Sequence, residues 1–318
     1  MTPTQLRAYA AVVRHGSVKQ AAAELHVSES AVSLNVGLLR KELGDQLFNR
    51  TAAGLAFTPG GLRLASRSAE LLGLQDRTIL EVSQAGQGRR MLRIAASSLF
   101  AEHAAPGLIE LFAARAADLD VELSVGQPGQ FGTLLATRAA DVVIGPEPAG
   151  LDPSVISRPV MNYQIILVVG PDHPLATTTA GPRQLREQTW LLGPSAASDM
   201  GAVPAMLRRL AVAEERQQIF QSHTAAIEEA KRSKGVAPVL SFAVAQDLAR
   251  GHLVRVSGTQ VHIDGVWHTL MLGEHGVPSA AAELTRFAST PRALQAMVRG
   301  AGVTVGRFRP SIHVTLWS

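Results

Sequence analysis

Hydroxyl side chains stand at three places where a short apolar run of the chain gives way to a helical pattern. They are Ser97 and Ser98, Ser195 and Ser198, and Ser222 and Thr224. A hydroxyl group in this position can cap the helix that follows, and it can also donate a hydrogen bond to a bound anion. Capping alone would explain any single one of them. As a set they indicate a place where a small molecule could be held.

A second group of hydroxyl side chains lies nearer the N-terminus, in a segment that a helix would divide into two faces. Ser28 can cap a helix ending near Gly44, whose apolar face would comprise Val32, Val36, Leu39 and Leu43. At about 100° per residue, the opposite face would hold Ser30, Ser33, Leu34, Gly37 and Lys41. Side chains this small would let the helix enter a DNA major groove, about 12 Å wide, and approach the base edges.

The sequence contains none of the familiar motifs for catalysis or metal binding. It has no cysteine, which removes thiol catalysis and cysteine-ligated zinc. It also has no Gly-x-Ser-x-Gly, P-loop or His-Glu-x-x-His motif. His262, His268 and His275, with Asp264 nearby, have spacings that match no familiar metal pattern. We therefore predict no enzyme, no catalytic residue, no metal site and no cofactor.

The positive charge of the chain is concentrated at its N-terminal end. The net charge is +4 over 318 residues, and the first 90 residues carry eleven basic against seven acidic side chains. A basic segment on a neutral body indicates an anionic polymer as a partner. The length favours two or three domains. The start of the chain resembles no signal peptide, and no run reaches the roughly 18 apolar residues of a membrane helix. We therefore expect a cytoplasmic protein with no membrane partner.

The elements that would carry Ser28, Ser30 and Ser33 form a helix-turn-helix. A first helix is predicted by the helical spacing of Leu6, Tyr9, Ala10 and Val13. Gly16 ends it, and Ser17 can cap a second helix. A short turn at His26 and Val27 then leads to the helix that Ser28 begins. Two short helices on a tight turn, the second with a small polar outer face, are typical of DNA-binding proteins.

A hairpin and a long helix are predicted next. The alternating runs 46–51 and 55–57 favour a wing, with Arg50 and Thr51 near its tip, where they could contact phosphates. Thr58 and Pro59 begin a helix over 59–86, because proline is favoured at the first helical position. Its stripe comprises Leu64, Ser68, Leu71, Gln75, Ile79 and Val82. A helix this long, with no neighbouring partner in the sequence, would pack against a copy of itself, which predicts a homodimer.

Together these segments resemble the signature of the LysR-type transcriptional regulators. Many fixed spacings carry the resemblance over about the first 65 residues, from Gln5-Leu6-Arg7 through Leu25-His26-Val27-Ser28 and Leu47-Phe48-Asn49-Arg50 to Phe57-Thr58-Pro59-Gly60-Gly61. Weaker matches follow at His173-Pro174-Leu175 and Gly251-His252-Leu253-Val254. The resemblance implies a homodimer or homotetramer on inverted-repeat promoter DNA. It also implies a sensor domain like the type 2 periplasmic binding proteins.

The predicted recognition helix departs from the usual LysR-type pattern at three positions. Glu29 and Asn35 stand where glutamine is usual, and Leu34 where a basic residue is usual. Glu29 could accept a hydrogen bond from a cytosine amino group or support the first helical turn. Leu34 could touch a thymine methyl group or pack on a neighbour, and Asn35 lies nearer the core by helical phase. The predicted DNA-binding residues are Ser28, Glu29, Ser30, Ser33, Leu34, Asn35, Arg50 and Thr51.

Strand-like and helix-like runs alternate over residues 91–300, which predicts an α/β fold with parallel strands. The strand-like runs include 92–96, 121–125, 141–145, 164–170 and 267–273. Ligands in such folds bind beyond the carboxyl ends of the strands. The family resemblance and the serine and threonine hydroxyls at the three helix starts (97–98, 195–198 and 222–224) together suggest a cleft between two lobes. Such a cleft would hold a small-molecule effector, for example a carboxylate. The predicted effector-binding residues are Ser97, Ser98, Gln127, Gly145, Ser195, Ser198 and Thr224.

The expected fold class is α/β, with a mainly helical winged helix-turn-helix domain followed by a two-lobed effector domain. The expected domains are 1–58 for DNA binding, 59–90 for a linker and dimerisation helix, 91–300 for the effector and 301–318 for a tail. Lobe I would comprise 91–160 and 268–300, and lobe II 161–267. We predict a regulator whose sequence-specific promoter binding is modulated by the effector. The alternatives are a non-specific architectural DNA-binding protein and a solute-binding transport component.

Overall fold

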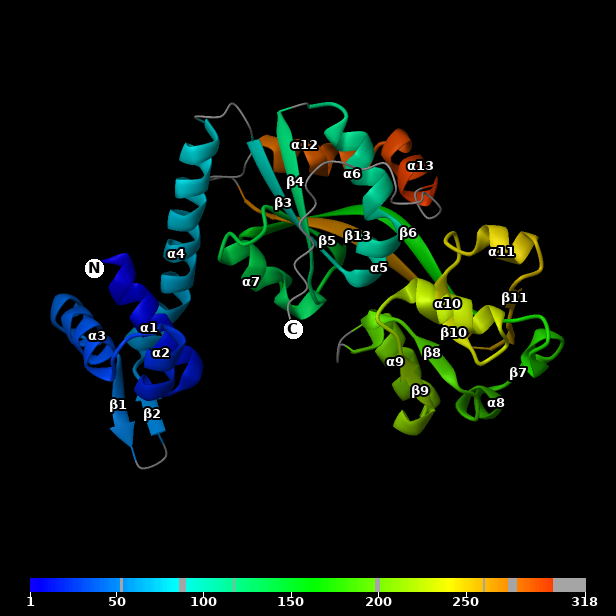
Figure 1. The fold of residues 1–318 in the computed structure, drawn as a ribbon, viewed down its shortest axis with the longest axis horizontal. Coiled ribbons are helices and arrows are strands. Elements are labelled where there is room, and N and C mark those ends of the chain that lie inside the picture. The colour runs from blue at the N-terminus through cyan, green and yellow to red at the C-terminus, as the bar shows by residue number, and fades with distance from the viewer. Residues whose placement is uncertain are drawn as a thin grey trace. The chain divides into compact units, whose positions relative to one another are not determined.

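The chain folds into two units, which a computed structural model describes for residues 1–51, 54–85, 90–116, 118–197, 201–259, 261–273 and 279–299. The side chains of residues 50, 54, 80, 81 and 83–85 are not described. One unit comprises Met1–Gln87 with Ala136–Ala139, and the other Gly88–Leu135 with Ala140–Ser318. A helical N-terminal part and a mixed helix and sheet body confirm the predicted fold class (Figure 1). None of the described helices is long and apolar enough to span a bilayer.

Three short helices of the N-terminal unit pack around one small core. They are α1 (Pro3–His15), α2 (Val18–Glu24) and α3 (Glu29–Leu43). Thr2, Ser17 and Ser28 each accept a hydrogen bond from a backbone N–H in the first turn of the following helix. Each helix therefore begins where a hydroxyl group can cap it. Tyr9 and Leu39 are fully buried between the helices.

A wing and a long helix complete this unit. Strand β1 (Phe48–Thr51) pairs antiparallel with β2 (Gly54–Phe57), and α4 covers Pro59–Ala85. Asp45 Oδ1 accepts hydrogen bonds from Leu47 N at 2.6 Å and from Thr58 Oγ1 at 2.7 Å. Thr58 Oγ1 in turn accepts one from Gly61 N at 2.9 Å. This chain of hydrogen bonds joins the start of α4 to the strand that opens the wing.

The second unit is built on a mixed seven-stranded sheet. Its strands are β3 (Arg90–Ala96), β4 (Leu119–Val125), β5 (Val142–Pro146), β6 (Val155–Val169), β10 (Ala237–Leu240), β11 (Val254–Arg255) and β13 (His262–Leu272). The strand order is β10-β6-β13-β5-β3-β4, with β11 also paired to β6. β3 runs parallel to β4 and β5, whereas β13 runs antiparallel to β5 and β6. The two long strands β6 and β13 pair over the whole length of β13.

The long strands connect two lobes (Figure 1). The first lobe adds α5 (Ser98–His103), α6 (Ala105–Ala113), α7 (Phe131–Ala136), α12 (Ser279–Ala288) and α13 (Pro291–Arg299). The second lobe holds α8 (Pro182–Arg186), α9 (Ala202–Leu210), α10 (His223–Lys231) and α11 (Ala245–Ala249). Its parallel strand pairs are β7 (Thr179–Ala180) with β12 (Ser257–Gly258), and β8 (Trp190–Leu192) with β9 (Gln217–Ile219). Single 3-10 turns lie at Pro128–Gln130, Pro174–Ala176, Pro194–Ala197 and Glu214–Arg216.

The β6–β13 ladder is interrupted by a bulge. Trp267 pairs with Met161 and His268 with Pro159, so Val160 is an extra residue on β6. Pro159 has no N–H to donate to a ladder, and a bulge is a place where a strand tolerates proline. The expected lobe boundaries at 160 and 268 fall at this bulge.

Two sequence expectations about these elements were wrong in detail. β6 begins at Val155 and not near 164, because its first half carries polar side chains such as Arg158 and Asn162, which hide the strand pattern. Leu43 was expected in the buried face of α3, but it is 44% exposed. It lies in the last turn before the left-handed Gly44, beyond the part of α3 that the core covers.

Candidate functional site

The serines of α3 lie on its exposed side. Ser30 and Ser33 are exposed, and the opposite face is buried through Val32, Val36 and Leu39. Ser28 Oγ accepts a hydrogen bond from the backbone N–H three residues along, at 3.2 Å, and lies 2.9 Å from Ser30 Oγ. The face predicted to meet a DNA groove is therefore accessible within this unit.

The three unusual positions of α3 differ in exposure. Glu29 is exposed, and Leu34 is 65% exposed, so its side chain does not pack on a neighbour within the unit. Asn35 is half-buried, and its Nδ2 donates to Ala31 O at 2.9 Å. Leu34 is thus free to meet an outside partner, whereas part of the Asn35 amide is already bound to the helix backbone.

A side chain of α3 supports the wing. Arg40 Nη2 donates to Phe48 O at 2.8 Å, and its guanidinium carbon lies 4.4 Å from the centre of the Phe48 ring. Arg40, Phe48 and Ser33 all line a groove of about 350 Å³ in this unit. Thr51 is exposed at the end of β1, and the side chain of Arg50 lies outside the described residues. Arg40 therefore helps to hold the wing in place.

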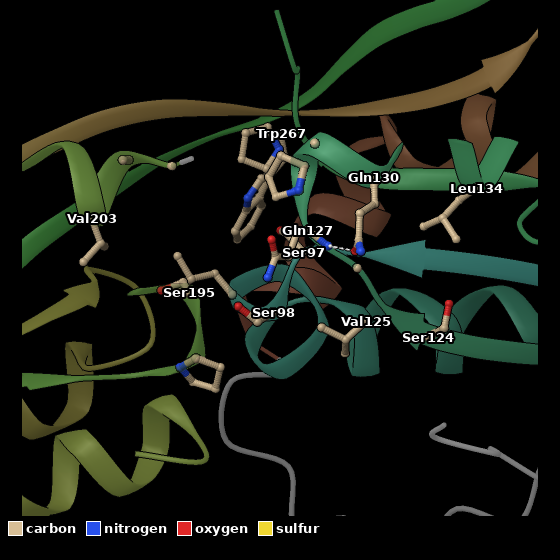
Figure 2. A pocket seen from close by; sticks show the side chains of 18 of the residues that line it. Ser97, Ser98, Ser124, Val125, Gln127, Gln130, Leu134, Ser195, Val203 and Trp267 are labelled. Carbon is tan, nitrogen blue, oxygen red and sulfur yellow. Dashed lines mark hydrogen bonds between the residues drawn. The ribbon is translucent and has the colours of Figure 1, made fainter. Parts of the chain in front are cut away.

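The second unit contains a cavity of about 800 Å³ between its lobes. The first lobe lines it with residues that include Ser97, Ser98, Ser124, Val125, Gln127 and Gln130. The second lobe contributes Ser195 and Val203, and the long strands contribute Tyr163, Ile165 and Trp267. Figure 2 shows side chains of both lobes and of β13 around this space.

Four of the predicted effector-binding residues line this cavity: Ser97, Ser98, Gln127 and Ser195. Gly145 is not among the lining residues. A Cβ atom there would come within 2.7 Å of the Phe131 ring, so this glycine makes room for a core side chain. Ser198 lies outside the described residues. Thr224 is not among the residues that line the cavity.

Thr224 belongs to a hydrogen-bonded junction between the lobes. Glu102 of α5 accepts hydrogen bonds at Oε1 from Thr224 N at 2.7 Å and from Thr224 Oγ1 at 2.6 Å. Its Oε2 accepts one from His223 N at 2.8 Å and lies 2.7 Å from His223 Nδ1. The positive end of α10 therefore already holds a carboxylate of the protein itself. His223 Nε2 extends the junction to Ser195 Oγ, 3.0 Å away on the cavity wall.

The surroundings of this junction shift two pKa values. Burial alone would raise the pKa of Glu102, but the hydrogen bonds from His223 and Thr224 outweigh it and hold the pKa well below its usual range. Burial lowers the pKa of His103 to about 4. Potential ligand atoms of Glu102, His103 and His223 lie within 4.8 Å of one another. Because both carboxylate oxygens already accept hydrogen bonds, a metal ion there would have to break them.

Nothing in the sequence indicates that Tyr163, Trp267, Glu102 and His223 belong to these sites. Tyr163 and Trp267 have the pattern of core strand residues, and nothing in their spacing shows that one edge meets a cavity. Ser222 and Thr224 did mark the start of a helix that attracts an anion. The partner could not be foreseen, because Glu102 is 121 residues from His223 in the sequence.

Comparison with known families assigns both units of the chain. Residues 3–62 match the bacterial regulatory helix-turn-helix proteins of the lysR family, and residues 85–304 match the LysR substrate binding domain. The chain therefore belongs to the LysR family of bacterial transcriptional regulators. It is a DNA-binding regulator with an effector-binding domain and not an enzyme, although the order Ser195-His223-Glu102 has the connectivity of a hydrolase triad.

Relatives of this chain are known from several bacteria. An uncharacterised HTH-type transcriptional regulator of Mycobacterium tuberculosis (strain H37Rv) is 57% identical over 321 residues, which span all of both chains. The HTH-type transcriptional regulator CfxR of Cupriavidus necator is 27% identical over 275 residues, 84% of each chain. The RuBisCO operon transcriptional regulator of Allochromatium vinosum is 32% identical over 192 residues, 59% of this chain and 62% of its own.

Solved structures share the fold at low sequence identity. ArgP from Mycobacterium tuberculosis has a TM-score of 0.59 at 20% identity, over 90% of this chain and 97% of its own. Full-length LysG from Corynebacterium glutamicum with the bound effector Arg has a TM-score of 0.50 at 20% identity, over 95% of this chain and 98% of its own. At this identity the likeness establishes the fold alone.

Proposed function

We propose that this regulator reads promoter DNA with the outer face of α3. The observation that carries the proposal is that Ser30 and Ser33 project from the exposed side of a helix whose other side is anchored in the core. Ser28, Ser30 and Ser33 would contact DNA, Glu29 would accept from a cytosine amino group, and Leu34 would touch a thymine methyl group. Arg50 and Thr51 of the wing would bind phosphates.

The proposed effector site is the cavity between the lobes, with Ser97, Ser98, Gln127 and Ser195 as ligand contacts. Because both lobes contribute to its lining, a ligand would have different affinities for different lobe arrangements and would shift their populations. Hydroxyl and amide groups could hold a small carboxylate, as the sequence suggested, or an uncharged molecule. The corresponding domains are 1–58, 59–90 and 91–300. Gly145 and Thr224 are not proposed as ligand contacts, and Ser198 stays a prediction.

A homo-oligomer on an inverted repeat is the proposed assembly. α4 exposes apolar side chains along its length, among them Leu71, Leu74, Ile79 and Val82. Pairing of two α4 helices would cover them and place two copies of α3 on half-sites about one helical turn apart. A homodimer or a homotetramer would satisfy this geometry. The proposed location is the cytoplasm, because a bacterial promoter lies there.

A gel-shift titration with the full-length protein tests the proposal. The probe is the intergenic DNA beside its own gene, with genomic fragments as labelled controls and unlabelled competitor in excess. Retardation of the intergenic probe alone is the expected result. Equal affinity for every fragment, or no retardation of any fragment, would contradict the proposal that α3 reads a specific promoter sequence.

A further inference from the structure

The first turn of α10 presents four hydrogen-bonding atoms to the other lobe. They are His223 N, His223 Nδ1, Thr224 N and Thr224 Oγ1, and each lies 2.6–2.8 Å from a carboxylate oxygen of Glu102. We name these four atoms the α10 socket. Glu102 belongs to α5 in the first lobe, whereas α10 belongs to the second. The socket therefore joins two lobes through residues that lie 121 positions apart in the sequence.

The helix α10 does not need Glu102 for its own start. Ser222 is its N-cap residue, and Ser222 Oγ accepts a hydrogen bond from Ala225 N at 3.1 Å. The backbone N–H groups of His223 and Thr224 precede that one and have no partner within a helix, so they can bind a group from outside it. The four hydrogen bonds to Glu102 therefore serve the contact between the lobes more than the formation of α10.

The second lobe holds the imidazole of the socket in place. A Cβ atom on Gly193 would lie 2.2 Å from His223 Cδ2, so the backbone at this glycine packs directly against the ring. Ser195 Oγ lies 3.0 Å from His223 Nε2. Because His223 is only 4% exposed, its ring has little room to turn. The second lobe thus shapes the socket in advance, which lowers the entropy cost of binding a carboxylate there.

The charge of Glu102 suits this socket. Burial would raise the pKa of Glu102, but the hydrogen bonds of the socket outweigh it and hold the pKa well below its usual range, so the carboxylate is ionised at neutral pH and can only accept. Hydrogen bonds to an ionised group are about twice as strong as those between neutral groups. The ring of His103 lies 5.7 Å from that of His223, and burial lowers the pKa of His103 to about 4, so it adds no charge at neutral pH.

Both partners of the junction are connected to the wall of the cavity. Helix α5 begins at Ser98, which lines the cavity, and carries Glu102 near its other end. Ser195, which lines the cavity from the second lobe (Figure 2), contacts His223. The long strands β6 and β13 link the same two lobes covalently. Separation of the lobes about these strands would draw Glu102 out of the socket, because the two halves of the junction belong to different lobes.

We propose that Glu102 and the α10 socket form a latch that holds the two lobes together around the cavity before any ligand binds. When the lobes separate, the carboxylate leaves the socket and both become hydrated. A ligand that prefers the closed arrangement acts together with the latch, whereas one that prefers an open arrangement has to release it. The latch goes beyond the proposed function, because it sets the arrangement of the lobes in the protein without ligand.

The test measures the distance between the lobes in the full-length protein without ligand. Because the chain has no cysteine, spin labels can be placed at Gln295→Cys on α13 and Ala205→Cys on α9, both at exposed positions, and read by double electron–electron resonance. Co-expression with an excess of the cysteine-free chain keeps each measured pair within one chain. We expect one dominant distance in the labelled wild type. Glu102→Ala should raise the ratio of a second, longer distance to the first at least about tenfold.

Two further variants keep the test decisive if Glu102→Ala folds poorly. Gly193→Ala removes no charge but displaces the His223 ring, so it should also increase the longer distance. Thr224→Val removes one of the four hydrogen bonds and keeps the shape of the side chain, so it should raise the same ratio about threefold. Thr178→Val is its matched control, because Thr178 is exposed in the second lobe and its Oγ1 donates to Pro174 O.

The control for the charged variant is Glu110→Ala, which removes an exposed carboxylate of α6 in the first lobe and should leave the distances unchanged. The latch is wrong if the folded variants at Glu102, Gly193 and Thr224 all keep the wild-type distance. It is also wrong if the two controls lengthen the distance as much as the latch variants do. Gel shifts of the intergenic probe with the wild-type preparation report on the proposed function independently of these results.

Discussion

A substitution at Ser33 tests most directly whether α3 binds DNA in a sequence-specific way. It is exposed on α3 and lies beside the groove next to the wing. Ser33→Arg places a long cation where a base edge must approach, so we expect specific DNA affinity to fall at least about tenfold while the fold is kept. Fluorescence anisotropy with promoter and scrambled duplexes measures this loss. Thr178→Arg adds the same charge in the other unit and should leave specific binding unchanged.

His103 should make the stability of the effector unit depend on pH. Burial lowers its pKa to about 4, whereas the unfolded chain has an ordinary value near 6.5. The unfolded state therefore takes up the proton first, and the free energy of unfolding should fall by up to about 3 kcal/mol as the pH drops from about 6.5 to about 4. Urea titrations across this range measure the slope. In His103→Leu the slope should be smaller, and an unchanged slope would contradict the assignment.

Residue roles could be predicted from the sequence only where a local rule decides them. Ser17 and Ser28 are caps because helix starts require acceptors, and both act as such. Leu43 and Thr224 were judged by the same local rules. The exposure of Leu43 depends on where the surrounding core ends, and the partner of Thr224 comes from the other lobe. Spacing along the chain carries no information about either.

At the scale of elements, the junction of α4 with the wing depends on a glycine. A Cβ atom on Gly61 would lie 2.0 Å from Leu47 O, and the nearby Tyr9 Oη already donates to Gly61 O at 2.8 Å. Gly61→Ala must therefore move α4 or the wing, and we expect the N-terminal unit to lose about 2–3 kcal/mol of stability. Thermal unfolding followed by circular dichroism measures the loss. Gly37→Ala, with no atom within 4 Å of its new Cβ, should be neutral or stabilising.

Glu102 is the corresponding test for the junction between α5 and α10. Glu102→Gln keeps the shape of the side chain but removes the charge that complements the end of α10, so we expect a loss of about 1–3 kcal/mol. The wild-type contribution is present above the ordinary glutamate pKa and is lost as the pH falls toward the lowered value. Urea unfolding at neutral pH measures it. Glu110→Gln, an exposed change on α6, should have little effect.

Most elements could be predicted because their patterns are local. The three N-terminal helices, the wing and the start of α4 follow from caps, turns and apolar spacing. The long strands β6 and β13 were recognised only in part, since a strand that leaves one lobe and enters another changes its surroundings midway. Arg158 and Asn162 lie on the exposed part of β6. Because of them, the alternation of apolar and polar residues that marks a strand is not visible over this part of the sequence.

At the scale of the whole molecule, α4 is the element that should control assembly. Ile79 is 60% and Val82 is 69% exposed on the isolated chain, an arrangement that favours burial against a second copy. Ile79→Glu should weaken self-association at least about tenfold, because it would bury a charge in that contact. Light scattering after size-exclusion chromatography measures the mass. Thr78→Glu, one residue away on an exposed position, is the control, and an equal effect would place the contact elsewhere.

The bulge between β6 and β13 also bears on how a bound molecule would be sensed. Trp267 is the last residue before the register shifts, and it lies fully buried at the edge of the cavity. The ribbon formed by these strands is the only part of the sheet that runs from one lobe into the other within the described chain. A molecule held by both lobes would therefore act on this ribbon, whose bend sets the angle between them.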